Sequence, residues 1–136
     1  MLDHIFLTVN DIDRSITFYE RVLPVLGITA RLDYDGKDGP PGHPDLKGFG
    51  AYGRMSFWLR QGHASPAAVH VGLVATSPAM VDAAHAEALA AGASEIHPPG
   101  PQPHYDPRYY AGQVRDPDGY SLEFVHKSWQ HEGPQP

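Results

Sequence analysis

The fold is decided by a turn and the strand that follows it, Asp116-Pro117-Asp118-Gly119-Tyr120-Ser121-Leu122-Glu123-Phe124-Val125. Proline presets φ, the aspartate side chains accept hydrogen bonds from backbone N–H groups, and glycine supplies the positive φ that such a turn needs. Glu123 is the only acidic residue in the strand that follows the turn. An acid in that place either faces solvent or is held by a partner, and earlier parts of the chain supply candidate partners.

Length and composition limit the class of protein. The chain has 136 residues, enough for one domain with a sizeable core. A net charge of −6 argues against a nucleic-acid partner, and the absence of cysteine excludes disulfides, thiol nucleophiles and thiolate metal sites. No apolar run approaches the roughly 18 residues of a membrane span, so we expect a cytoplasmic protein without membrane contact. Nine histidines raise the question of a metal site.

Residue patterns predict the elements of the first half of the chain. Alternating apolar residues indicate strands, an apolar stripe at helical spacing indicates a helix, and Asn10 or Asp11 can cap that helix. The expected order is strand 3–9, helix 13–23, strand 28–34, loop 35–48, strand 49–52 and strand 54–61.

The same pattern then restarts. Ser77 can cap an alanine-rich helix that has Pro78 in its first turn, and Gly92 ends this helix. The expected order is strand 69–75, helix 77–91, strand 93–97, a proline-rich loop 98–107, strand 109–115 and strand 120–125.

The chain is therefore predicted to be α+β, with a βαβββ module repeated once. The modules span about residues 1–61 and 68–127 of a single domain, 1–127, and residues 128–136 form a tail. A spacing of 66 residues separates His4 from His70 and also Gly53 from Gly119. The same spacing makes Phe57 in the first module equivalent to Glu123 in the second.

Strand parity places two histidines on the face opposite the helices. In both first strands the apolar face must cover the helix, which leaves His4 and His70 on the other face. Two imidazoles and the Glu123 carboxylate make a facial set that holds a divalent metal and leaves other positions open. Phe57 cannot ligate, and an open site favours catalysis over a structural metal. The alternative is that each histidine is an ordinary surface or core residue.

The turn also predicts a strand register. If Asp116 pairs with Gly119, Glu123 faces Gly112, which leaves space beside the carboxylate, and Tyr110 points into the cavity. Tyr110 is then either a proton donor near the metal or a packing residue. Residues 98–110 hold five prolines and several polar aromatic residues. This segment is either a lid over the site or a surface loop.

These residues resemble the vicinal oxygen chelate superfamily, which includes glyoxalase I, bleomycin-resistance proteins and extradiol dioxygenases. The resemblance covers about residues 1–127. It depends on the segments 3–5, 15–19, 57–59, 69–71, 115–119 and 122–124. It implies paired modules that form a half-open barrel around a central divalent metal, Fe, Mn, Ni or Zn, and a homodimer. Carried over, the ligands are His4, His70 and Glu123; the Phe57 strand lacks the fourth ligand of glyoxalase I.

Two functions follow as hypotheses. The first is a glyoxalase- or dioxygenase-like metalloenzyme, a lyase or dioxygenase, that activates an oxygenated small-molecule substrate. The second is a metal-free protein that binds and sequesters a drug or aromatic molecule, as bleomycin-resistance proteins do. The candidate proton donors are Tyr110, Tyr105 and His104, and the candidate substrate-binding residues are Phe57, Trp58, Arg108 and Gly112.

Overall fold

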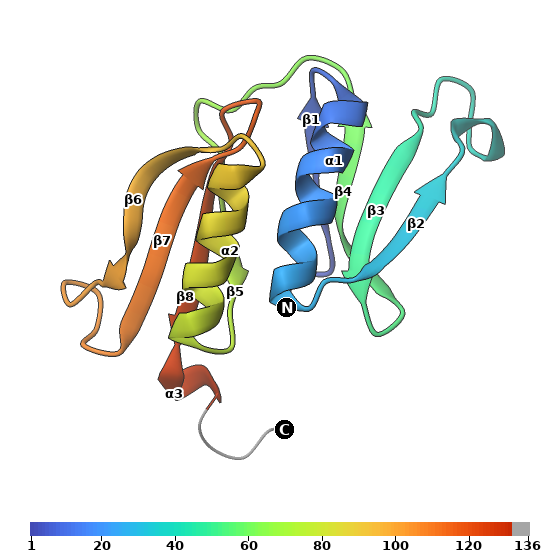
Figure 1. The fold of residues 1–136 in the computed structure, drawn as a ribbon. Helices are drawn as coiled ribbons and strands as arrows, with labels where there is room; N and C mark the ends of the chain where they lie inside the picture. Colours follow the sequence, from blue (N-terminus) through green and yellow to red (C-terminus); the bar gives the residue numbers. More distant parts are fainter. Residues whose placement is uncertain (132–136) are drawn as a thin grey trace. The chain divides into compact units, whose positions relative to one another are not determined.

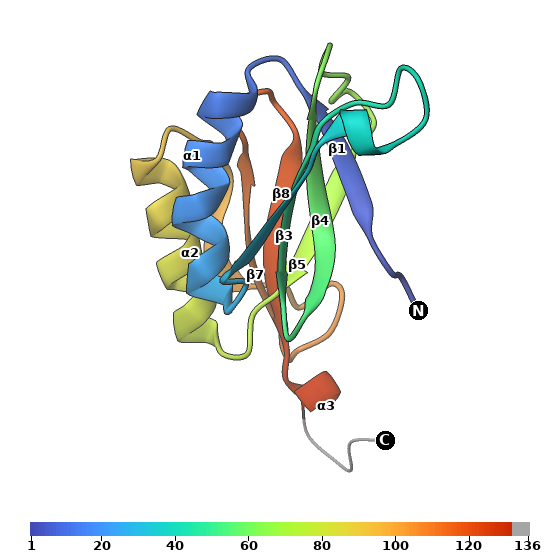
Figure 2. The same cartoon turned by 90° about the vertical axis from the view of Figure 1, so that its right-hand side faces the viewer.

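The computed structural model describes residues 1–131 and divides into two compact units, Met1–Ser65 and a second that begins at Pro66. Each unit pairs one long helix with a four-stranded sheet, which confirms the predicted α+β class with two βαβββ modules (Figures 1 and 2). The predicted tail, 128–136, starts with α3 (Ser128–His131), and residues 132–136 lie outside the described residues. Within residues 1–131, no helix is long and apolar enough to cross a membrane.

The first unit follows the predicted order of elements. Asp11 caps α1, because its side chain accepts a hydrogen bond from the Arg14 backbone N–H at 3.1 Å. The sheet order is β1-β4-β3-β2, with β1 parallel to β4 and the other pairs antiparallel. The elements are β1 (Ile5–Val9), α1 (Ile12–Val22), η1 (Leu23–Leu26), β2 (Ala30–Tyr34), η2 (Gly36–Asp38), β3 (Leu46–Ala51) and β4 (Arg54–Gln61).

Aromatic rings fill the core between α1 and its sheet. The Tyr19 ring lies 4.8 Å from the ring of Phe57 and 6.3 Å from that of Phe49, and Phe18 meets Tyr19 edge-on at 4.9 Å. All four side chains are buried. Burying each contributes about 1.5–3 kcal/mol, and the ring pairs add to this. The helix therefore covers one face of the sheet and leaves the opposite face for other contacts.

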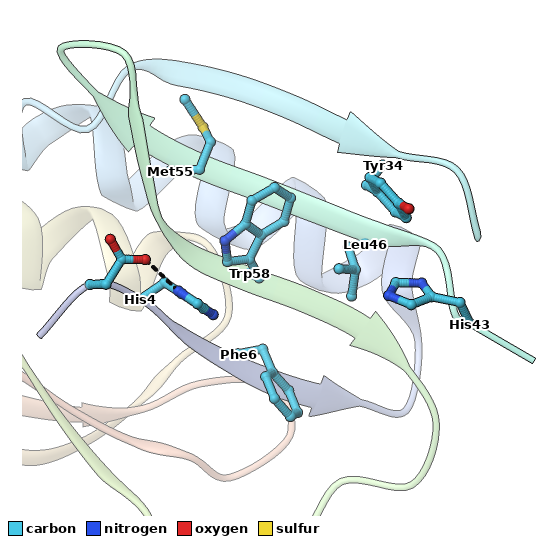
Figure 3. A pocket seen from close by; sticks show the side chains of 8 residues that line it. His4, Phe6, Tyr34, His43, Leu46, Met55 and Trp58 are labelled. Carbon is cyan, nitrogen blue, oxygen red and sulfur yellow. Dashed lines mark hydrogen bonds and ion pairs between the residues drawn. The ribbon is translucent and has the colours of Figure 1, made fainter. Parts of the chain in front are cut away.

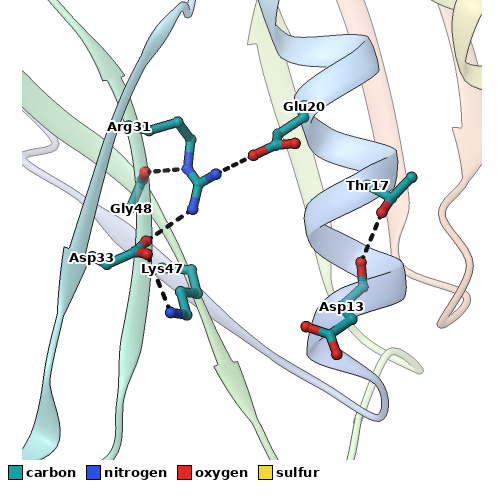
Figure 4. Close-up of polar contacts among 7 residues, drawn as sticks. All are labelled: Asp13, Thr17, Glu20, Arg31, Asp33, Lys47 and Gly48. Carbon is teal, nitrogen blue, oxygen red and sulfur yellow. Dashed lines mark hydrogen bonds and ion pairs between the residues drawn. The ribbon is translucent and has the colours of Figure 1, made fainter.

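Arg31 ties α1 to the far strands of this sheet (Figure 4). Its guanidinium donates to Glu20 on α1, to Asp33 at 2.9 Å and to the Gly48 carbonyl at 3.1 Å. The same group lies 4.4 Å from the centre of the Phe49 ring. One planar side chain thus joins the helix and two strands by charge-assisted hydrogen bonds.

The second unit repeats the arrangement. Its sheet order is β5-β8-β7-β6, with β5 parallel to β8 and the other pairs antiparallel. Ser77 caps α2 through the Met80 backbone N–H at 3.1 Å, and Pro78 occupies the first turn as predicted. The elements are β5 (His70–Val74), α2 (Pro78–Ala90), β6 (Ser94–Pro101), β7 (Tyr109–Arg115) and β8 (Ser121–Lys127).

The turn between β7 and β8 forms as expected, but it is wider than predicted. The buried Asp116 carboxylate accepts the backbone N–H groups of Asp118 and Tyr120, both at 2.9 Å, and Gly119 has a φ of +96°. The Asp116 N–H donates to the Tyr120 carbonyl at 2.9 Å. Residues 116 and 120 therefore close the turn, so the predicted register is wrong by one residue.

β6 is longer than predicted. It runs to Pro101, so the first part of the proline-rich segment expected to be a loop is strand. β6 is an edge strand, and its pairing with β7 shifts between Glu95 and His97 and again between His97 and Gly100. Prolines fit such a strand because an edge and its bulges do not need every backbone N–H.

α2 packs a histidine onto the sheet. His85 is buried, and its Nε2 lies 2.8 Å from a Glu95 carboxylate oxygen on β6. Its Nδ1 is buried and has no hydrogen-bond partner among residues 1–131. A Cβ added to Gly112 on β7 would lie 2.7 Å from this Nδ1. Gly112 therefore makes room for the helix.

Candidate functional site

Glu123 lies at the centre of the candidate site in the second unit. It is on β8, beside β5 on one side and β7 on the other. Its side chain is only 8% exposed. One carboxylate oxygen, Oε1, lies 3.1 Å from His70 Nε2 and also accepts from Gln113 Nε2 at 3.1 Å. The other oxygen, Oε2, accepts from the Tyr109 hydroxyl. The acid is therefore held by partners from two strands and does not face open solvent.

His70 opens β5 and faces Glu123. Its Nδ1 lies 2.8 Å from the Ser121 hydroxyl, and its side chain is 48% exposed. The Ser121 hydroxyl can accept from Nδ1–H or donate to an unprotonated Nδ1, so it can pair with either imidazole tautomer. When Nδ1 donates to Ser121, Nε2 presents a lone pair toward Glu123 Oε1. Ser121 shares a face with Glu123, two residues away, and was not singled out from the sequence.

The one-residue error in register exchanges the two neighbouring tyrosines. Glu123 pairs with Gln113 and Tyr110 pairs with His126, so Tyr110 does not point toward Glu123. The Tyr110 hydroxyl instead donates to Asp82 on α2 at 2.7 Å, and this hydrogen bond raises the pKa of the phenol. The predicted inward orientation of Tyr110 is wrong, because a shift of one residue moves a side chain to the other face of the sheet.

Tyr109 takes the place that the sequence assigned to Tyr110. Its hydroxyl donates to Glu123, and its ring lies 4.9 Å from the ring of Tyr105 and 5.5 Å from Lys127 Nζ. Burial, followed by the hydrogen bond to the Glu123 carboxylate, raises the pKa of the Tyr109 phenol. Sequence reasoning missed Tyr109 and Gln113, although the turn would have indicated both with the correct closing pair.

Two other predicted substrate residues have different surroundings. Gly112 pairs with Phe124 and lies under His85, so the predicted space beside the carboxylate is wrong. Arg108 forms two hydrogen bonds to the Asp106 carboxylate, at 3.0 and 3.2 Å, and lies over the Trp129 ring at 4.5 Å. These bonds hold the pKa of Asp106 below its usual range. A substrate contact by Arg108 stays a prediction.

A polar pocket of about 200 Å³ adjoins Glu123 within the second unit. Tyr105 and His104, both predicted proton donors, line it with their rings 4.2 Å apart. The full lining is His97, Gln102, His104, Tyr105, Tyr109, Ala111, Gln113 and Glu123. The pocket therefore brings hydroxyl, imidazole and amide groups to one carboxylate.

His4, the predicted ligand in the first unit, lies next to an acid. Its Nδ1 lies 2.6 Å from the Asp3 carboxylate, and Asp3 is also 3.3 Å from an Arg54 guanidinium nitrogen. The contact with His4, with a smaller contribution from Arg54, lowers the pKa of Asp3. A carboxylate on Nδ1 fixes the tautomer that leaves Nε2 as the free acceptor. His4 and His70 thus both have Nδ1 next to an oxygen of their own unit.

An apolar pocket of about 320 Å³ lies beside His4 within the first unit (Figure 3). This volume falls in the range of small-molecule sites, which are mostly apolar with a few polar groups. Figure 3 shows Trp58 between His4 and Met55 on one side and Tyr34 and His43 on the other. The lining residues are Asp3, His4, Phe6, Tyr34, His43, Leu46, Met55 and Trp58.

The sheet holds the Trp58 indole in place. Trp58 pairs with Gly48 across the strands, and a Cβ on Gly48 would lie 2.6 Å from the indole ring. The missing side chain therefore lets the ring lie against the neighbouring strand. On the parallel side, Trp58 pairs with Phe6, which is half-exposed. The predicted role of Trp58 in substrate binding stays a prediction, and the pocket gives it a location.

Phe57 is not the counterpart of Glu123. It is buried against Tyr19 on the helix side of the sheet and lines neither pocket, and its predicted contact with substrate stays a prediction. β4 carries one extra residue, Ser56, because Phe49 pairs with Phe57 and Gly50 with Met55. Beyond this bulge the spacing between the units becomes 65, and Trp58 is the residue equivalent to Glu123.

Comparison with known proteins identifies the family. The sequence pattern described as "Glyoxalase/Bleomycin resistance protein/Dioxygenase superfamily" matches residues 1–124. The chain belongs to this superfamily. No curated protein matches the sequence.

Several solved structures share this fold. A glyoxalase/bleomycin resistance protein from Albidiferax ferrireducens T118 is 25% identical over 91% of this chain and 97% of its own, with a TM-score of 0.76. The fosfomycin resistance protein FosX from Mesorhizobium loti is 18% identical over 91% and 89%, with a TM-score of 0.62. TioX from Micromonospora sp. ML1 is 20% identical over 90% and 92%, with a TM-score of 0.57. Likeness at these last two identities shows the fold alone.

The donor atoms suit the divalent metal that the superfamily resemblance implies. Two ligand atoms about 2.1 Å from one ion and at right angles lie roughly 3 Å apart, close to the 3.1 Å between His70 Nε2 and Glu123 Oε1. Within either unit alone, residues 1–131 contain no group of three His, Asp or Glu side chains that could hold a metal. The three-ligand set, which joins His4 to His70 and Glu123, stays a prediction.

Proposed function

We propose that this protein is a small metalloenzyme that binds an oxygenated small molecule, with His4, His70 and Glu123 as ligands of a divalent Fe, Mn, Ni or Zn ion. Two neutral imidazoles and one carboxylate suit such ions and leave coordination positions for a substrate. When bound, the ion would supply Lewis acidity toward the substrate oxygens. The superfamily assignment supports the proposal at the level of fold.

The arrangement of His70 and Glu123 carries this proposal. The two donor atoms lie 3.1 Å apart, and each side chain is oriented by a further group, Ser121 for the imidazole and Tyr109 for the carboxylate. Such supporting hydrogen bonds are typical of metal ligands, because they fix the tautomer and the orientation of the donor.

The chain's own residues would handle the substrate in two ways. The apolar pocket beside His4 would bind and desolvate the carbon skeleton, with Trp58 and Phe6 as aromatic contacts. In the polar pocket beside Glu123, His104 and Tyr105 would hold or transfer a proton. Tyr105 is exposed, so solvent can exchange its proton.

The second candidate function is metal-free binding of an aromatic molecule. The apolar pocket favours it, because Gly48 lets the Trp58 indole lie against the neighbouring strand and the Tyr34 hydroxyl has no hydrogen-bond partner among the described side chains. His43 Nδ1 lies 2.8 Å from the Pro44 carbonyl, which can only accept, so in the neutral ring Nε2 is an acceptor. An aromatic ring with a polar substituent fits these groups.

Metal analysis of protein prepared without a histidine tag separates the two functions. We expect about one divalent ion per chain, and an excess of the binding metal at 100 times its Kd would stabilise the fold by about 2.7 kcal/mol. His70→Ala should abolish this binding without unfolding the protein. His63→Ala is the matched control, because His63 is exposed and outside both pockets.

Two outcomes would contradict the metalloenzyme. One is full metal content in His70→Ala, which would remove His70 from the ligand set. The other is protein that carries no metal and gains no stability from Fe²⁺, Mn²⁺, Ni²⁺ or Zn²⁺, which would favour the aromatic-binding function. A homodimer and a cytoplasmic location complete the proposal, and light scattering at micromolar concentration would test the first.

A further inference from the structure

The Glu123 carboxylate has two oxygens with different surroundings. Oε1 lies 3.1 Å from both His70 Nε2 and Gln113 Nε2. Oε2 accepts from the Tyr109 hydroxyl. Because a buried carboxylate is costly unless hydrogen bonds satisfy it, these donors determine which way the group points. The hydroxyl on Oε2 leaves Oε1 as the oxygen that faces His70.

Tyr109 is itself held from two sides. Its ring lies 4.9 Å from the Tyr105 ring, and Lys127, its cross-strand partner, has its ammonium 5.5 Å from the ring centre. Tyr105 in turn stacks near His104 at 4.2 Å. Tyr109 thus joins the segment after β6 to the carboxylate on β8. An interaction of this kind needs a fixed ring, since a mobile phenol would not hold an oxygen in one direction.

We propose that Tyr109 is a positioning residue that orients Glu123 for metal binding, so that Oε1 and His70 Nε2 point toward one ion. The inference rests on the proposed metal site and adds to it a residue outside the ligand set. It also assigns opposite roles to adjacent tyrosines. The Tyr109 hydroxyl donates a hydrogen bond to Glu123, and the Tyr110 hydroxyl, on the other face of β7, donates one to Asp82.

The adjacent tyrosines supply the matched test. Tyr109→Phe removes one hydroxyl and almost no volume, and we expect Mn²⁺ and Zn²⁺, each titrated alone, to bind about 10- to 100-fold more weakly. Tyr110→Phe removes a hydrogen-bonded, more exposed hydroxyl from the opposite face and should leave both affinities within about twofold. Isothermal titration of the untagged protein measures them without any substrate.

A second measurement does not depend on metal. In EDTA, the unfolding midpoints of Tyr109→Phe, Glu123→Gln and the double variant form a cycle. We expect Tyr109→Phe to lower the midpoint less in the Glu123→Gln background, because the hydroxyl then loses a neutral partner instead of a carboxylate. If the midpoint changes of the two single variants add up to that of the double variant, Tyr109 does not interact with Glu123 and the inference is overturned.

The two measurements separate the failure of this inference from the failure of the proposed function. Metal binding by the parent protein with unchanged affinity in Tyr109→Phe would overturn the inference alone. A parent protein that binds neither Mn²⁺ nor Zn²⁺ and gains no stability from Fe²⁺ or Ni²⁺ would overturn the proposed metal site and the positioning role with it, even where the cycle in EDTA is not additive. Weaker binding in Tyr109→Phe alone, together with a non-additive cycle, supports the inference.

Discussion

Gly112→Ala should destabilise the protein through its contact with α2 and leave ligand binding intact. The added Cβ would lie 2.7 Å from His85 Nδ1 and 3.2 Å from Pro99 Cγ, both closer than van der Waals contact. His85 cannot easily move away, because it is buried and its other ring nitrogen lies 2.8 Å from Glu95. Overpacking costs about 1–3 kcal/mol, and the lower unfolded-state entropy of alanine offsets about 0.4–1 kcal/mol of this. We expect a net loss of about 1–2 kcal/mol.

Urea unfolding would measure this loss, and a thermal melt should show a midpoint lowered by roughly 3–10 °C. Gly100→Ala is the control, because a Cβ at Gly100 in β6 meets nothing within 4 Å. Equal stability of the two variants would refute the steric argument. Weaker metal or ligand binding by Gly112→Ala, at unchanged stability, would instead restore the sequence-based view that Gly112 makes space beside Glu123.

Two further predictions test the first unit. Tyr52 is fully exposed at the tip of the β3–β4 hairpin with a φ of +53°, next to Gly53 at +75°. Because asparagine tolerates a positive φ better than tyrosine does, Tyr52→Asn should stabilise the protein by about 0.5–1 kcal/mol in urea unfolding. No gain in stability would mean that the turn is not strained. Trp58→Glu should tighten divalent-metal binding, measured by titration, because it places a carboxylate at the position equivalent to Glu123. Phe57→Glu should unfold the first unit, since it buries an unpaired charge against the core. Tighter metal binding by a folded Phe57→Glu would contradict the alignment in which the β4 bulge makes Trp58, not Phe57, equivalent to Glu123.

Local chemistry made most elements predictable from the sequence. Asp11 and Ser77 cap the two long helices because their short polar side chains satisfy free backbone N–H groups. β4 was predicted with its observed bounds, because apolar and polar residues alternate from Arg54 to Gln61. β6 was predicted too short, because prolines lower strand propensity everywhere except at an edge, and edges are a property of the whole sheet.

The candidate site was predictable only where it did not depend on register. His70 and Glu123 share a face whatever the turn geometry, since parallel strands from the same module carry them. The β7–β8 register determines which β7 side chains lie beside Glu123. One more residue in the turn brings Tyr109 and Gln113 there in place of Tyr110 and Gly112. A hydrogen bond between Asp116 and Tyr120 sets that residue count, and the sequence alone allows either closing pair.

The two units have the same architecture but opposite chemistry on the face away from the helix. Phe6 pairs with Trp58 in the first unit, and at the equivalent place in the second unit Gly72 pairs with Glu123. An aromatic pair suits the carbon skeleton of a ligand, and it desolvates nearby polar groups. A glycine beside a carboxylate does the reverse, because it leaves that side of the acid open to an ion or a polar ligand. His4 and His70 stand at equivalent positions in the two units, so each unit combines an imidazole with a different neighbouring chemistry, an aromatic pair in the first unit and a carboxylate in the second.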